Sequence, residues 1–325
     1  MIGHAPVMLT EVLTALNVKA SETIVDGTFG GGGYTRAILA AADCKVIGLD
    51  RDPDAITRGK ALEQEMAGRF QIVETQFSTM DELDGPVDAV VLDIGVSSFQ
   101  IDQAERGFSF MQDGPLDMRM SASGPNAAEV VAQLSEDELT KIFQSYGEER
   151  EARRVARAMV NDRVATPYLR TSDLAGICSR VIGRKQADHI HPATRIFQAL
   201  RIYVNDEIGE LEMALAAAEA ILGEGGRLVV VTFHSLEDRV VKTFFNERSK
   251  EASGSRHTPI NSGPAPTFEL ITRKPVTASE DEIAANPRAR SAKLRAGVRT
   301  SAPPRPANVS GLEGVTPLQR LKRAA

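Results

Sequence analysis

The sequence has few cysteines and no long run of apolar residues. Cys44 and Cys178 are its only cysteines, and they lie far apart in no C-x-x-C motif. We therefore expect neither a disulfide framework nor a structural zinc site, and we predict no bound metal. No apolar stretch reaches the length that crosses a bilayer, and the first residues lack the pattern of a signal peptide. These absences favour a cytoplasmic protein that is neither exported nor inserted in a membrane.

Basic residues are scarce in the first third of the chain. Residues 1–105 hold 7 Lys and Arg against 17 Asp and Glu, although the whole chain carries a net charge of only −6. Residues 288–323 hold nine basic residues and one acid, and residues 147–204 hold 11 against six, with His189 and His191 in addition. The two basic zones could face a polyanion. A solvated, arginine-rich helix face explains the charge equally well.

Strand and helix patterns alternate over the first hundred residues, which predicts a βαβ arrangement. The apolar strand patterns lie at 22–30, 45–52, 69–77 and 87–95. Continuous apolar runs such as Val90 to Leu92 suit parallel strands that are covered on both faces. We therefore predict an α/β fold with a helix-covered parallel sheet.

The alternation of strand and helix patterns then stops, and only helical patterns follow. Ser135 and Thr171 are the capping residues at expected helix starts. The alternation resumes with a helix over 206–222, a strand over 227–235 and a helix over 236–250. The expected organisation is a discontinuous sheet domain (1–104 and 206–300), an inserted helical domain (105–205) and a basic flexible tail (301–325).

Two further strand patterns, at 268–275 and 290–299, close the sheet domain. A closing pair after the fifth strand and its helix is similar to the reversed edge strand of the large Rossmann-like methyltransferase superfamily. Nicotinamide dehydrogenases generally lack such a strand.

The first predicted strand ends at Asp26 in a turn with four consecutive glycines, Gly30 to Gly33, that leads directly into a helix. Glycines let the backbone turn sharply and approach a ligand, and the helix N-terminus offers unpaired N–H donors. This signal is weak by itself, because similar turns serve dinucleotides or form plain loops.

Side chains at the ends of the next strands strengthen the signal. Asp50 follows Asp26 by 24 residues, where an acid accepts the hydroxyls of an adenosine ribose. Phe77 could pack on the adenine, although core packing explains an isolated aromatic residue, and Asp93 could meet the cofactor or the reacting group. All lie at predicted strand C-termini, where doubly wound sheets bind ligands.

Four long motifs then agree in order with one known family. They are LDIGVSSFQIDQAERGFSFMQDGPLDMRM, HPATRIFQALRIYVNDE, TFHSLEDRVVK and NPRARSAKLR. On these motifs the chain closely resembles the RsmH (MraW) family of ribosomal RNA small-subunit methyltransferases, from His4 to Arg295.

The resemblance implies a Rossmann-like, S-adenosylmethionine-dependent methyltransferase sheet with an inserted all-helical domain. The implied reaction transfers a methyl group to the exocyclic N4 amine of a cytidine in the decoding centre of 16S rRNA. The implied partner is small-subunit rRNA or the assembled small ribosomal subunit, and the oligomeric state stays open, with a homodimer among the alternatives. The residues matching the family's cofactor contacts are Gly32, Gly33, Tyr34, Asp50, Phe77, Asp93 and Gln100. The family often has His where Tyr34 stands, which leaves a side-chain role there in doubt.

The catalytic residue is not determined by the sequence. Asp93 is a weak candidate for accepting the amine proton, but the Pro-Pro-aromatic motif of DNA amino-methyltransferases does not follow it. His234, at the end of the fifth predicted strand, is the other weak candidate. A helix cap is the structural alternative there, since Ser235 and Asp238 fit an S-x-x-D capping box.

Arginines of the inserted region are candidates for rRNA recognition. Arg195 and Arg201 lie on a helix whose apolar positions Ile196, Leu200 and Tyr203 predict a separate core face. Asp117 and Arg119 could line the entrance of the active site or form a salt-bridged loop.

Three other functions stay open at this point. They are methyl transfer to DNA or to a small molecule, a non-catalytic RNA-binding role in ribosome assembly, and nicotinamide-dependent dehydrogenation. Binding of S-adenosylhomocysteine without binding of NADH would exclude the last.

Overall fold

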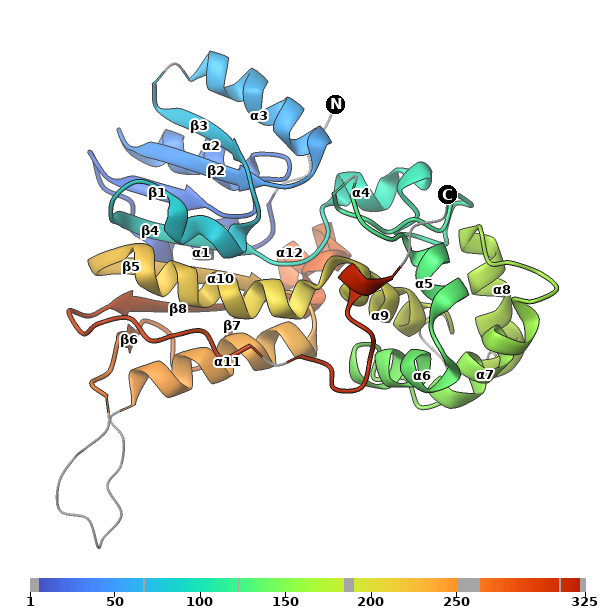
Figure 1. Cartoon of the computed structure of the whole chain (residues 1–325). Helices are drawn as coiled ribbons and strands as arrows, with labels where there is room; N and C mark the ends of the chain where they lie inside the picture. The colour runs from blue at the N-terminus through green and yellow to red at the C-terminus, as the bar shows by residue number, and fades with distance from the viewer. Residues whose placement is uncertain are drawn as a thin grey trace, which may run out of the picture. The chain divides into compact units, whose positions relative to one another are not determined.

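The computed structural model describes residues 6–66, 68–121, 123–183, 190–250, 264–309 and 311–321. The chain divides into two compact units (Figure 1). Unit 1 comprises Met1–Gly95 and Ile208–Val309, and unit 2 comprises Val96–Glu207 and Ser310–Ala325. No helix in the described ranges is both long and apolar enough to cross a membrane.

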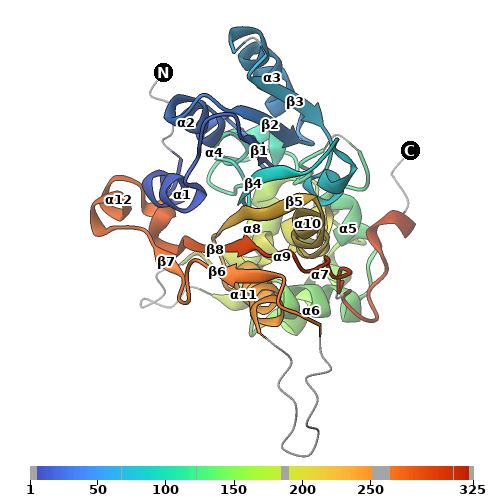
Figure 2. The ribbon, with the colours of Figure 1, turned by 90° about the vertical axis from the view of Figure 1, so that its left-hand side faces the viewer.

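Unit 1 is built on an eight-stranded sheet with the order β3-β2-β1-β4-β5-β8-β6, and β7 also pairs with β8 (Figure 2). The strands are β1 (Thr23–Asp26), β2 (Lys45–Asp50), β3 (Phe70–Glu74), β4 (Val87–Asp93), β5 (Leu222–Thr232), β6 (Phe268–Leu270), β7 (Val276–Thr277) and β8 (Lys293–Arg299). β1 to β5 are parallel, and β8 runs antiparallel between β5 and β6. The predicted parallel sheet with a reversed closing strand is confirmed.

Helices cover both faces of this sheet, as the continuous apolar strands require. Helices α1 (Leu9–Leu16), α2 (Gly33–Ala41) and α3 (Pro53–Glu65) contribute to the core of one face, and α10 (Glu207–Ile221) and α11 (Ser235–Ser249) to the core of the other. The short elements of unit 1 are η1 (Phe77–Glu82), α12 (Glu280–Ala285) and η3 (Pro287–Ser291). The strand order reverses between β1 and β4, so ligands are expected at the carboxyl ends of these strands.

The described residues of unit 2 form helices and one isolated β-bridge, between Pro115 and Arg170. The elements are α4 (Ser98–Asp102), η2 (Ala104–Arg106), α5 (Ala127–Gln133), α6 (Glu136–Ser145), α7 (Ala152–Asp162), α8 (Thr171–Ile182), α9 (Thr194–Asn205) and η4 (Leu318–Arg320). Ser135 caps α6, as expected, in a capping box with Glu138. The expected cap at Thr171 is wrong by one residue, because Arg170 is the N-cap of α8 and Thr171 accepts the N–H of Gly114 instead.

The unit boundaries differ from those expected at 104/105 and 205/206. The segment after β4 already belongs to unit 2, and unit 1 resumes only at Ile208. The end of a strand pattern marks the end of β4 but not the start of unit 2, because membership of a unit depends on contacts with residues farther along the chain.

The C-terminal segment, expected to be a flexible tail, makes specific contacts in unit 2. The backbone N–H and hydroxyl of Thr316 donate to Glu138 at 2.9 and 2.6 Å, and Tyr203 donates to the carbonyl of Thr316. Four apolar residues, spaced three apart, pack against the helical core: Leu312, Val315, Leu318 and Leu321. This regular apolar spacing indicates packing, although the composition of the segment is typical of disorder.

Candidate active site

The glycine turn lies between β1 and α2, at the carboxyl edge of the sheet. Gly30 and Gly32 adopt positive φ angles of 52° and 74°. A Cβ atom on Gly32 would lie 2.8 Å from the ring of Phe29, so a larger residue would clash as well as being strained. Gly32 precedes α2 without a side-chain cap, which leaves the first N–H groups of the helix directed at this turn.

Asp50, the last residue of β2, holds the turn in place. Its Oδ2 accepts the N–H of Gly30 at 2.8 Å, and its Oδ1 accepts the N–H of Asp52 at 2.8 Å. Burial raises the pKa of this carboxyl despite these bonds. A carboxylate has about four lone-pair sites, so Asp50 can accept ribose hydroxyls in addition.

Asp26, the last residue of β1, is a second buried acid of this edge. It accepts the hydroxyl of Thr35 at 2.7 Å and the N–H of Thr28 at 3.3 Å. Burial, opposed by these bonds, raises its pKa to about 6. The sequence marks Asp26 only as the end of a strand. Its burial is seen only in the folded chain.

Asp93, the last residue of β4, is the most perturbed of these acids. Its Oδ1 is buried and has no hydrogen-bond partner among the described residues. Its backbone N–H donates to the hydroxyl of Thr28 at 2.6 Å, which joins it to the glycine turn. Burial, together with the negative charges of Asp26 and Glu237, raises the pKa of Asp93 to about 8. This oxygen is therefore available to accept a hydrogen bond from a bound molecule.

The two aromatic candidates occupy different settings. Tyr34 is buried in α2, its hydroxyl donates to the carbonyl of Val7, and burial raises its pKa well above 10. Its side chain therefore anchors the N-terminal segment, and a cofactor contact there would have to use the backbone. Phe77 does not end β3 but opens η1, and it packs partly on the core close to Gly27.

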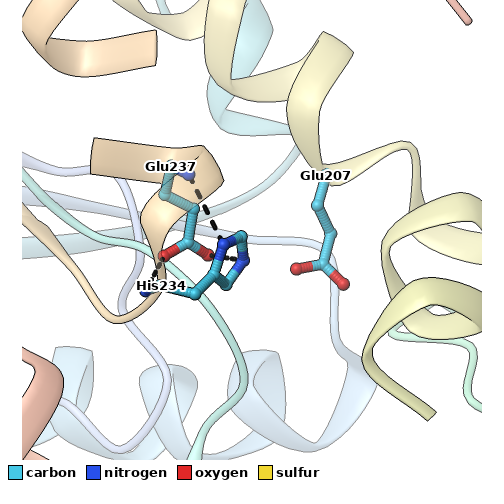
Figure 3. A group of neighbouring side chains, drawn as sticks. All are labelled: Glu207, His234 and Glu237. Carbon is cyan, nitrogen blue, oxygen red and sulfur yellow. Dashed lines mark hydrogen bonds and ion pairs between the residues drawn. The ribbon is translucent and has the colours of Figure 1, made fainter. Parts of the chain in front are cut away.

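His234 caps α11, with its side chain directed at Glu237 (Figure 3). The Nδ1 of His234 accepts the N–H of Glu237 at 3.4 Å, and its Nε2 lies 2.8 Å from Glu237 Oε1. Glu237, fully buried, accepts the N–H groups of Phe233 and His234 through Oε2. The expected Ser235 capping box is therefore wrong by one residue, because the helix starts at Ser235 and its cap precedes it.

The remaining site candidates lie in unit 2. A cofactor contact by Gln100 and a place at the site entrance for Asp117 and Arg119 stay predictions. Gln100 forms a capping box with Ser97, accepting the Ser97 N–H at 3.0 Å. Asp117 and Arg119 form a two-bond ion pair at 2.8 and 2.7 Å, which matches the salt-bridged loop.

Both arginines of α9 that were candidates for RNA contact already form hydrogen bonds within unit 2. Arg201 makes a two-bond pair with Glu207, at 2.7 and 2.8 Å, and Arg195 donates to the carbonyl of Glu148 at 3.2 Å. Glu207, labelled in Figure 3, is the first residue of α10. The predicted core face of α9 is confirmed by the burial of Ile196, Leu200 and Tyr203.

The basic segment at the end of unit 1 is also partly neutralised. Lys293 and Arg295 both pair with Asp238, at 3.0 and 2.7 Å. Asp238 therefore pairs with β8, and its predicted place in the helix cap is wrong. Of the histidines in the other basic zone, His189 lies outside the described residues.

These residues fit a nucleoside cofactor with a cationic end. The turn and the start of α2 offer backbone N–H groups, Asp50 ends β2 where folds of this kind bind a ribose, and the Oδ1 of Asp93 is buried with no hydrogen-bond partner among the described residues. The fold and this edge define a Rossmann-like methyltransferase whose cofactor is S-adenosylmethionine.

Comparison with known proteins identifies the family. The MraW methylase family matches residues 1–300, and the chain belongs to this family. It is 57% identical over 308 residues to the "Ribosomal RNA small subunit methyltransferase H" of Azorhizobium caulinodans, covering 93% of this chain and 89% of the relative. It is 54% identical to the protein of the same name from Maricaulis maris, over 99% and 98% of the two chains. A solved putative methyltransferase from Streptococcus mutans, in complex with SAH, is only 11% identical, with a TM-score of 0.42 over 92% and 99% of the chains.

Proposed function

We propose that this protein methylates the exocyclic N4 amine of a cytidine in the decoding centre of 16S rRNA. The observation that carries the proposal is the match, over nearly the whole of both chains, to relatives named as ribosomal RNA small subunit methyltransferases. The buried acceptor at Asp93 supports it chemically, because an amine that loses a proton needs such a group.

Positioning and proton acceptance are the tasks left to the protein. S-adenosylmethionine supplies an electrophilic methyl group, and the transfer forms a nitrogen–carbon bond while the sulfur–carbon bond breaks. The cytidine amine is a poor nucleophile, because its lone pair is delocalised into the ring. An acceptor that holds its hydrogens and takes one proton favours the reaction.

Asp93 is the better placed of the two catalytic candidates. Its pKa of about 8 lies near neutral pH, where a general base is most effective. His234 already uses Nδ1 for the helix cap and faces Glu237 through Nε2. We therefore assign His234 and Glu237 to shaping the loop after β5, and Asp93 to the amine.

We infer that unit 2 recognises the rRNA and that the substrate is small-subunit rRNA or the assembled small subunit, in the cytoplasm. The helical unit carries the basic zone 147–204, and base methylation requires an unstacked base, which folded RNA offers in deformable segments. A homodimer stays an alternative to a monomer.

The test uses small subunits purified from a strain that lacks this protein. They are incubated with the enzyme and labelled S-adenosylmethionine, and their nucleosides are analysed by mass spectrometry. Labelled N4-methylcytidine is expected. Label on another nucleoside would overturn the assigned target, and no label despite measured cofactor binding would favour the assembly-factor role.

A further inference from the structure

Unit 2 carries a basic hollow that the site described above does not use. It has a volume of about 330 Å³, and α7 forms it together with one residue of α8. Its lining residues are Arg153, Arg154, Arg157, Ala158, Asn161 and Val181. We call this feature the α7 hollow.

The sequence of α7 separates a core face from a basic face. Four apolar residues of the helix are buried in the core of unit 2: Ala152, Val155, Ala156 and Met159. Arg153, Arg157 and Asn161 follow one another at intervals of four residues, so they lie along one face with a rise of about 6 Å per step. This geometry presents a row of donors along the helix.

Ion pairs at the α7 hollow leave an excess of positive charge. A single oxygen of Glu136 accepts from Arg153 at 3.4 Å and from Arg157 at 3.3 Å. Arg154 pairs with Glu151 at 2.7 Å and also donates to the carbonyl of Val181 at 3.1 Å. Three guanidinium groups therefore face two carboxylates.

These arginine side chains are 60 to 67% exposed, and exposed ion pairs of this kind contribute little stability. Arg170 and Arg180 are similarly exposed in single ion pairs, whereas Arg163 and Arg201 are held by the fold. Arg163 donates to the buried ends of helices at Val131 and Leu134, and Arg201 is held by Glu207 with only 15% exposure. An incoming anion can engage the arginines of the α7 hollow at small cost to the fold, and all three of them line the same hollow.

We propose that the α7 hollow binds backbone phosphates of the substrate RNA. A guanidinium group offers five N–H donors in a planar fork that matches a phosphate, and the carbonyl of Val181 holds Arg154 in place. Phosphate contacts fix position without reading sequence. The α7 hollow thus orients the RNA, while the chemical step stays with Asp93 in unit 1. This inference rests on the proposed function.

The test compares two double variants of the full-length protein. Arg153→Gln with Arg157→Gln removes two charges from the α7 hollow. Arg36→Gln with Lys60→Gln removes two exposed charges from unit 1 and serves as the matched control. Affinity for purified small-subunit rRNA is measured as a function of salt, alongside KM, kcat and the affinity for S-adenosylhomocysteine.

We expect the α7 variant to reduce the salt slope by about one for each lost phosphate contact. KM for RNA should rise while kcat and cofactor affinity stay unchanged, and Arg153→Lys with Arg157→Lys should restore the slope. An unchanged slope, or an equal change in the control, would overturn the proposal. Normal binding to naked rRNA with weakened binding to the subunit would assign the α7 hollow to a ribosomal protein and also overturn it. If the wild-type enzyme does not methylate the RNA, the proposed function is contradicted instead. The affinity measurement is independent of that outcome, so the two failures can be told apart.

Discussion

The two units differ in the burial of their functional charged groups. Unit 1 buries carboxyl groups at its strand ends, where Asp26 and Asp93 have pKa values of about 6 and about 8. Unit 2 keeps the arginines of the α7 hollow exposed in weak ion pairs. Burial raises the pKa of a carboxyl group, so that it can exchange a proton with a small bound group near neutral pH. Exposure leaves an arginine accessible to the phosphates of a large polyanion. The difference agrees with the proposed assignment of the chemistry to unit 1 and of RNA binding to unit 2.

Replacing Asp93 by Asn should have the largest effect. The variant keeps the shape but cannot take a proton, so we expect kcat to fall by roughly 10²- to 10⁴-fold. In the wild type, kcat should rise with pH up to about 8, as the carboxylate forms, and the variant should lose this dependence. Calorimetry with S-adenosylhomocysteine separates this loss from cofactor binding. A wild-type pH profile in the variant would exclude Asp93 as the acceptor.

Asp93→Asn should lower activity but raise thermal stability. The pKa of Asp93 rises on folding from 3.8 to about 8, so the folded state is favoured by protonation and loses stability as pH increases through that range. Asp93→Asn cannot ionise, so its Tm should exceed that of the wild type most at pH 8 to 9 and least near pH 4. A Tm difference independent of pH would contradict the buried-charge assignment.

Phe143→Ala tests whether the units are independent. Phe143 is fully buried in the core of unit 2, and its truncation should cost about 3–5 kcal/mol. We expect an earlier unfolding transition by circular dichroism, with S-adenosylhomocysteine still bound and methylation of RNA lost. Simultaneous loss of cofactor binding would show that the two units unfold as one.

Asp50→Ala should weaken cofactor binding by roughly 10- to 100-fold, the value of hydrogen bonds to a charged acceptor. The loss combines missing ribose contacts with a loosened glycine turn, because Asp50 also holds Gly30. Asp43→Ala, whose side chain is 90% exposed, is the matched control. Wild-type affinity in calorimetry would refute the assignment of Asp50.

Glu138→Gln should have the smallest effect, about 1 kcal/mol or less. Although burial opposes it, hydrogen bonds from Thr316 and Ser135 lower the pKa of Glu138 to about 2. Its stabilising contribution is therefore present above pH 4.5 and lost as pH falls toward 2. Limited proteolysis should cut the C-terminal segment of the variant faster at neutral pH, and equal rates would show that Glu138 does not hold that segment.

The strand ends and the glycine turn were predictable because both depend on local sequence. The apolar runs before Asp26, Asp50 and Asp93 marked the strands, and parallel strands bring their carboxyl ends to one edge. Helix caps were less predictable, because a cap is decided by one residue and by its tertiary neighbours. His234 caps α11 while Ser235 was expected to, and Asp238 pairs with Lys293 and Arg295 rather than with the helix end.

The order of strands and helices, the glycine turn and the family could be predicted from the amino-acid sequence, because periodicity and motif spacing are local properties of the chain. The contact of Tyr34 with Val7, the burial of Asp93 Oδ1 and the bond between Thr316 and Glu138 are seen only in the folded chain. Each of these depends on residues brought together from distant positions or on the removal of water. Burial and partner choice are set by the packed fold, and they in turn set the pKa values on which the proposed chemistry rests.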